Sequence, residues 1–204
     1  AVAFVAYPEP GVQVTFTSDH LRLKLAMEGV VGLRSRGRGT HNIGVYEALA
    51  IAERSDGQLF GDVVRRECPP DPGFGRNQCE DDVRAESSVI ARDTRQNAAQ
   101  SLRGLRDLLL ALSVIEGPKT LILMSEMLIV ETPGDLDEVI RAAAFAQVTI
   151  NVLVMDVPRN DVTLRDIGPT ATQDRAMQVS GLADLASGSR GAMYQIVGSG
   201  DSVF

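Results

Sequence analysis

A chain of 204 residues is long enough for one α/β domain with a sizeable core, and its 44% hydrophobic and 23% charged content is typical of a globular protein. The net charge of −7 disfavours a dedicated nucleic-acid binder, because affinity for phosphates depends mainly on positive charge. No stretch approaches the roughly 18 apolar residues of a membrane span. Only Lys24 and Lys119 are lysines, and this arginine bias indicates a GC-rich bacterial genome rather than a function.

The chain opens with two apolar runs, Ala1–Tyr7 and Val12–Phe16, around a Pro-Glu-Pro-Gly turn. This pattern predicts a β-hairpin. The segment TSDHLRLKLAMEGVVGL that follows has a helical pattern, with Ser18 as the expected cap. The residues expected on the buried side of this helix are Leu21, Leu25 and Met27.

An arginine-rich loop, GLRSRGRG, leads to Thr40 and a second helical segment. The loop is either a phosphate-binding element or the solvated approach to Thr40, and the negative net charge favours the second interpretation. The segment THNIGVYEALAIAE predicts a helix, because apolar side chains recur in it at helical spacing. These side chains are Ile43, Tyr46, Leu49 and Ala50.

The only two cysteines, Cys68 and Cys79, frame the turn-rich sequence CPPDPGFGRNQC within residues 55–79, which we expect to be irregular. A disulfide would close this short loop and stabilise it by about 3 kcal/mol. Two free thiols are the alternative. A zinc site is disfavoured, because neither His20 nor His41 is near in the sequence and there is no second cysteine pair. A disulfide predicts an oxidising compartment: periplasm, cell surface or medium.

The second half of the chain alternates helices with short, continuous apolar strands. A helix is predicted from Glu80 to about Glu116, followed by a strand over 119–126, a helix over 135–147 and a strand over 148–156. A further helix over 175–187 precedes a last strand over 192–197. The first of these helices carries an apolar stripe of Leu102, Leu105, Leu109 and Leu112.

This alternation predicts an α/β fold with a doubly wound, mostly parallel sheet flanked by helices. The N-terminal hairpin is expected at one edge of that sheet. Residues 57–97, which carry the cysteine loop, are interpreted as an insertion.

Polar residues follow two of the predicted strands: Ser125 and Glu126 after the first, and Asp156 after the second. Ligands of such folds bind beyond the carboxyl ends of the strands, and Thr40 can reach the same edge. Oxygen ligands of this kind suit a hard divalent cation such as Mg²⁺. The alternatives are that Thr40 only caps its helix and that Glu126 is a solvent-facing loop residue.

Five segments together resemble a von Willebrand factor A domain, most closely the bacterial branch of secreted proteins related to it. They are FVAYPEPGVQVTFTSD, GRGTHNIGVYEALAIAE, GPKTLILMSEMLI, VTINVLVMD and LADLASGSRGAMYQIV. The resemblance covers nearly the whole chain apart from the cysteine-bearing segment. It implies a metal-ion-dependent adhesion site in which Thr40 matches a threonine ligand and Glu126 takes the place of an aspartate. Met127 stands where the family has a glycine.

The family places an Asp-x-Ser-x-Ser motif after its central first strand, and this motif is absent from the sequence. The resemblance therefore implies a single domain over residues 1–204 that is truncated at both ends, with the central strand and the rest of the metal site upstream.

The function implied by the resemblance is a non-enzymatic module that binds a protein partner. Arg38, His41 and Asp156 are expected on the partner-binding face. A structural subunit of an extracellular or surface assembly is the alternative, and the oligomeric state and the partner stay open. An enzyme of the α/β hydrolase type is disfavoured, because no Gly-x-Ser-x-Gly turn joins a strand to a helix.

Overall fold

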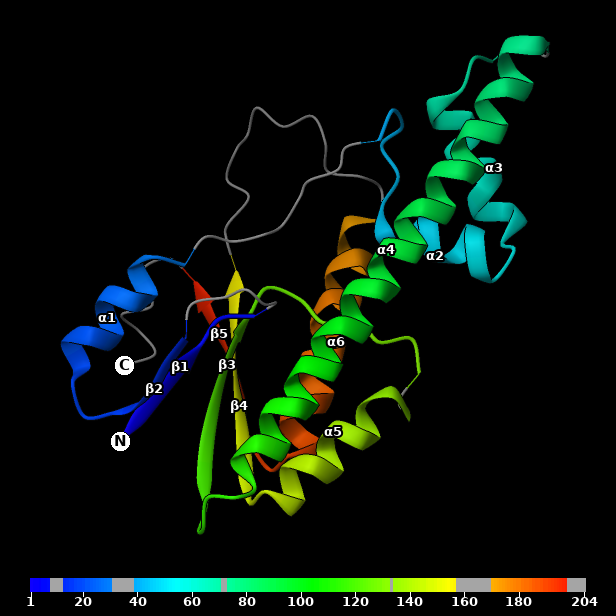
Figure 1. Cartoon of the computed structure of the whole chain (residues 1–204). Coiled ribbons are helices and arrows are strands. Elements are labelled where there is room, and N and C mark those ends of the chain that lie inside the picture. The colour runs from blue at the N-terminus through cyan, green and yellow to red at the C-terminus, as the bar shows by residue number, and fades with distance from the viewer. Residues whose placement is uncertain (8–12, 31–38, 71–72, 133, 157–169, 198–204) are drawn as a thin grey trace.

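The computed structural model describes residues 1–7, 13–30, 39–70, 73–132, 134–156 and 170–197. These residues form a mixed α/β fold with a two-stranded antiparallel hairpin and a three-stranded parallel sheet (Figure 1). The strands are β1 (Val2–Val5), β2 (Gln13–Thr17), β3 (Lys119–Ser125), β4 (Val148–Asp156) and β5 (Met193–Val197). The helices are α1 (His20–Glu28), α2 (Val45–Glu53), α3 (Gly57–Glu67), α4 (Phe74–Leu112), α5 (Gly134–Phe145) and α6 (Ala171–Gly188). None of the described helices is long and apolar enough to cross a bilayer.

The predicted N-terminal hairpin is confirmed, with Phe4 of β1 opposite Val14 of β2. The expectation that it lies at an edge of the parallel sheet is wrong, because in the described structure it forms a sheet of its own. Tyr7, just after β1, links the hairpin to α4 by donating a hydrogen bond from its hydroxyl to the Gln100 carbonyl at 3.0 Å. Its ring lies over Gly104, where a Cβ atom would come within 2.2 Å of it.

Helix α1 packs on the hairpin with a different face from the one predicted. Asp19, and not Ser18, caps the helix, because its carboxylate accepts a hydrogen bond from the Arg22 amide at 3.1 Å. Leu23 is the buried residue of this helix. The three residues predicted to be buried are exposed: Leu21 by 66%, Leu25 by 60% and Met27 by 44%.

The segment predicted to be irregular, residues 55–79, is mostly helical. Asp56 caps α3 by accepting hydrogen bonds from the amides of Gln58 and Leu59, both at 3.0 Å. Helix α4 begins at Phe74, six residues before the predicted start, and is 39 residues long. Its N-terminal part packs with α3 and extends away from the sheet, whereas its C-terminal part lies along the sheet (Figure 1). The Pro- and Gly-rich composition therefore marks only the short turn between two helices.

The parallel sheet has the strand order β3–β4–β5, with Leu121 beside Ile150 and Val152 beside Met193. Helices α4, α5 and α6 all pack on one of its faces. The predicted stripe on α4 is confirmed: Leu109 is fully buried, and Leu102, Leu105 and Leu112 pack against the same core. The core side chains of β4 are Val148, Ile150, Val152 and Val154, and those of the helices include Leu109, Leu136, Val139, Leu182 and Leu185.

The opposite face of this sheet is not covered by helices in the described structure, so the doubly wound arrangement is seen only in part. Exposure alternates along β3, because Leu121 and Leu123 pack on the core whereas Ile122 and Met124 are 57% and 44% exposed. Apolar residues on both faces of a strand predict burial on both sides. Among the described residues, helices cover only one face, although Leu153 on the other face is only 7% exposed.

Candidate functional site

The predicted site residues at the carboxyl edge of the sheet occupy the ends of their strands as expected. Ser125 is the last residue of β3 and Asp156 the last residue of β4. The Ser125 hydroxyl is engaged with its own loop, since it donates to the Met127 carbonyl at 3.0 Å and accepts from the Met127 amide at 3.3 Å. Glu126 is half-buried. Arg38 and the side chain of Asp156 lie outside the described part of the structure.

These donors do not make up a complete Mg²⁺ site. Among the described residues, Glu126 belongs to no group of three or more histidine, cysteine or acidic side chains with converging ligand atoms. A hard divalent cation needs about six oxygen ligands in a near-regular arrangement. The Ser125 hydroxyl is engaged with the backbone of its own loop.

Thr40 is exposed and lies in the loop before α2. The alternative that it caps this helix is wrong, because α2 begins at Val45 with Gly44 in the capping position. The Gly44 amide donates to the Glu47 carboxylate at 3.1 Å. The N-terminus of α2 is also held against α6, since the Tyr46 amide donates to the Asp174 carboxylate at 2.6 Å.

The loop around Thr40 folds over a carboxylate of α4, that of Glu86. The Glu86 Oε2 atom accepts a hydrogen bond from the His41 amide at 3.2 Å and lies 2.9 Å from His41 Nδ1. Gly39 approaches the same carboxylate so closely that a Cβ atom would overlap Glu86 Oε1. The glycine next to Thr40 therefore makes room for Glu86.

His41 also contacts the cysteine pair. Cys68 and Cys79 form the predicted disulfide, and the Cys79 Sγ atom lies 3.5 Å from His41 Nε2. A zinc site is disfavoured in the sequence because His41 is 38 residues from Cys79. The fold brings them together because α4 carries both Cys79 and Glu86, two turns apart on one side of the helix. His41, with 9% of its side chain exposed, thus faces inward and not toward a partner.

A buried ion pair supports the base of this loop. Glu47 of α2 is 2% exposed and accepts two hydrogen bonds from Arg66 of α3, at 2.9 and 3.0 Å. Arg66 also donates to the Asn42 carbonyl at 2.7 Å, in the loop that carries His41. The hydrogen bond to Glu47 is the main reason why the pKa of Arg66 lies above its ordinary value.

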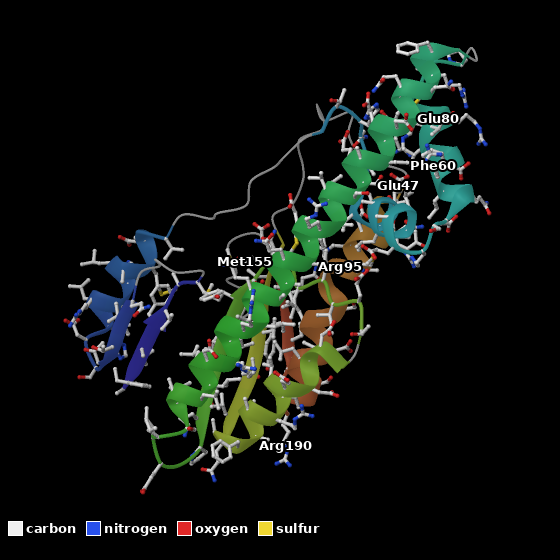
Figure 2. All side chains as sticks on the ribbon, turned by 45° about the vertical axis from the view of Figure 1, so that its right-hand side comes forward. Glu47, Phe60, Glu80, Arg95, Met155 and Arg190 are labelled. Carbon is white, nitrogen blue, oxygen red and sulfur yellow. A yellow bond between two sulfur atoms is a disulfide. The ribbon has the colours of Figure 1, made fainter. Side chains whose placement is uncertain are left out.

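Sequence reasoning missed Glu47, Arg66 and Glu86, because no local pattern separates them from the many solvated charges of their helices. Glu47, Phe60 and Glu80 all lie in the helical part that carries the disulfide, whereas Met155 lies apart from them, near the carboxyl end of β4 (Figure 2). The described structure therefore has two separate features: the uncovered sheet with its carboxyl edge, and the cluster of His41, Glu86 and the disulfide. No family model, curated protein or solved structure matches this chain.

Proposed function

We propose that this protein is a non-enzymatic protein-binding module of the von Willebrand factor A type, which holds a partner on the uncovered face and edge of its parallel sheet. The observation that carries the proposal is the exposure of large apolar side chains on this face. Parallel sheets are normally covered on both faces, and exposed apolar patches mark interaction sites. The exposed residues are Ile122 (57%), Met124 (44%), Met155 (44%) and Tyr194 (47%).

The register of the strands places these side chains on one face of the sheet. Met124 of β3 lies beside Leu153 of β4, which in turn lies beside Tyr194 of β5. In a parallel sheet such neighbours project from the same face. Leu153 is only 7% exposed, so the exposed side chains of Met124 and Tyr194 flank a buried leucine. Met155, two residues further along β4, adds an exposed apolar side chain to the same face.

The partner is expected to contribute an extended segment with aliphatic side chains. Strand β3 is an edge strand of the described sheet, so its outward backbone groups can pair with an added strand. Such pairing gives affinity through main-chain hydrogen bonds, and alternate side chains give specificity. A segment as long as the seven residues of β3 would lie alongside Ile122 and Met124.

The disulfide supports a setting outside a reducing cytoplasm, in the periplasm, at the cell surface or in the medium. A structural subunit of an extracellular assembly is the second candidate, and the same open edge supports it, because a second copy could supply the added strand. Size-exclusion chromatography with light scattering separates the two, since only the second candidate forms a stable oligomer without a partner.

Peptide selection tests the binding surface. We expect a phage-displayed library of random linear peptides to yield ligands with alternating aliphatic residues. A double variant, Ile122→Lys with Met124→Lys, adds two positive charges to this face. It should bind the selected peptides about tenfold or more weakly, because a lysine ammonium loses hydration when it is covered. The variant should fold, since both side chains are largely exposed.

The control is Val114→Lys, which places a single lysine on an apolar residue that is 82% exposed beyond the end of α4. It should leave peptide binding unchanged. Binding should also survive EDTA, because the described donors complete no Mg²⁺ site. Equal binding by the sheet variant and the wild type would contradict the proposed surface. Loss of binding in EDTA that Mg²⁺ restores would instead place the partner at a metal on the carboxyl edge.

A further inference from the structure

The disulfide has a histidine beside it that a purely structural cross-link does not require. His41 Nε2 lies 3.5 Å from Cys79 Sγ, and the ligand atoms of His41, Cys68 and Cys79 all lie within 4.8 Å of one another. In tetrahedral zinc sites the usual Zn–S and Zn–N bond lengths place neighbouring ligand atoms about 3.5 to 3.8 Å apart. The imidazole and the Cys79 sulfur already have this separation.

The imidazole is oriented as metal-binding histidines usually are. Glu86 Oε2 lies 2.9 Å from His41 Nδ1 and also accepts the His41 amide. A carboxylate that accepts a hydrogen bond from Nδ1–H leaves Nε2 unprotonated, with its lone pair available on the side of Cys79 Sγ. Metal-binding histidines commonly have a carboxylate partner of this kind, which fixes the tautomer and the ring orientation.

The surroundings favour a cation whose charge is neutralised by its ligands. Cys68 is 8% exposed and belongs to an apolar cluster with Val63, Val64 and Val83. Two thiolates balance the charge of Zn²⁺, so the loaded site would place no net charge among these side chains. Thiolate and imidazole together are typical zinc ligands.

We propose that Cys68, Cys79 and His41 form a redox-controlled Zn²⁺ site, which is closed as a disulfide under oxidising conditions and binds the metal after reduction. A dithiol reductant transfers two electrons and two protons to the sulfur–sulfur bond and becomes a disulfide itself, leaving two thiols. Zn²⁺ then displaces both thiol protons to solvent and takes the His41 lone pair, and water fills the fourth position. The metal replaces the covalent link between α3 and α4 and ties the loop before α2 to both. This inference is independent of the proposed binding function.

Zinc titration of the full chain tests this proposal, with Co²⁺ as a spectroscopic probe of thiolate ligands. Before reduction, neither cysteine should react with an alkylating agent, and no metal should bind with thiolate-to-cobalt absorption. After treatment with a dithiol and its removal under argon, one Zn²⁺ should bind per chain and raise the thermal midpoint of the reduced protein. His41→Ala should weaken this binding by about tenfold or more, and Glu86→Gln by about tenfold.

The matched control is His20→Ala, because His20 is an exposed histidine at the start of α1. It should bind Zn²⁺ as the wild type does. Non-specific binding through whichever histidine is available would instead be weakened equally by the His20 and His41 substitutions. Circular dichroism of each reduced variant, with and without Zn²⁺, reports whether the helices persist. The proposal is overturned if the reduced wild type binds no Zn²⁺, or if His41→Ala binds it as tightly as the wild type.

Discussion

Replacing Arg66 with methionine is expected to lower the free energy of unfolding by about 3 kcal/mol. The substitution keeps an apolar side chain of similar length but removes the guanidinium that donates two hydrogen bonds to Glu47. Glu47 is only 2% exposed, so its carboxylate would stay buried without its cationic partner. Urea unfolding followed by circular dichroism measures the loss.

Two variants show whether the loss comes from the buried carboxylate. Arg65→Met removes the neighbouring arginine, whose side chain is 78% exposed and pairs with Asp62 on the surface, and should cost less than about 1 kcal/mol. The double variant Glu47→Leu with Arg66→Met removes both charges and should be more stable than Arg66→Met alone. If the double variant were the less stable one, the ion pair would not be the reason for the loss.

Replacing Gly191 with alanine is expected to destabilise the sheet by about 3 kcal/mol, the upper part of the range for overpacked sites. A Cβ atom at this position would lie 1.8 Å from the Ile150 carbonyl oxygen of β4, and a backbone atom cannot rotate away as a side chain can. The amide of Gly191 also donates to the Ala186 carbonyl at 2.9 Å, which fixes the turn from α6 to β5. The new methyl group would push β5 away from β4.

The matched control is Gly61→Ala, in the middle of α3, where a Cβ atom would meet nothing within 4 Å. Alanine favours a helix over glycine by about 1 kcal/mol, so this variant should be slightly more stable than the wild type. Thermal or urea unfolding of the two variants should therefore change in opposite directions. A Gly191→Ala protein as stable as the wild type would show that β5 is not held closely against β4.

The sheet and its helices could be predicted because their signals are local and mutually consistent. Strands β3 and β4 are continuous apolar runs, and α4 carries leucines at helical spacing, so pattern and packing agree. The covering of the second face could not be predicted in the same way. A run such as Leu121–Met124 is apolar on both sides whether or not a second layer is present, and here Ile122 and Met124 are exposed.

The buried side of α1 was predicted wrongly for a related reason. The leucines at positions 21, 23 and 25 alternate with Arg22 and Lys24 along HLRLKLAME, and this spacing does not place all three on one helical face. Leu23 is buried because α1 packs on the hairpin with that side, and Leu21 and Leu25, which share the opposite side of the helix, are exposed. Tertiary contacts, not local periodicity, decided which leucine is buried.

The cluster of His41, Glu86 and the disulfide illustrates the limit of spacing rules for candidate sites. Cys68 and Cys79 are close in sequence, and their pairing could be predicted. His41 reaches them only because α2, α3 and α4 pack together, and Glu86 has no signature that distinguishes it from the other charges of α4. The glycine before Thr40 was the one available signal, since Gly39 allows the close approach of Glu86.

Hydrogen exchange of the backbone amides of β3, with and without a selected peptide, tests the central claim most directly. The proposal predicts that amides within Lys119–Ser125 directed away from β4 become protected when the peptide binds, because the added strand supplies their hydrogen-bond acceptors. Amides directed toward β4 should change little, since that ladder already protects them. Protection confined to the loop around Thr40 and His41, with β3 unchanged, would contradict binding at the uncovered sheet.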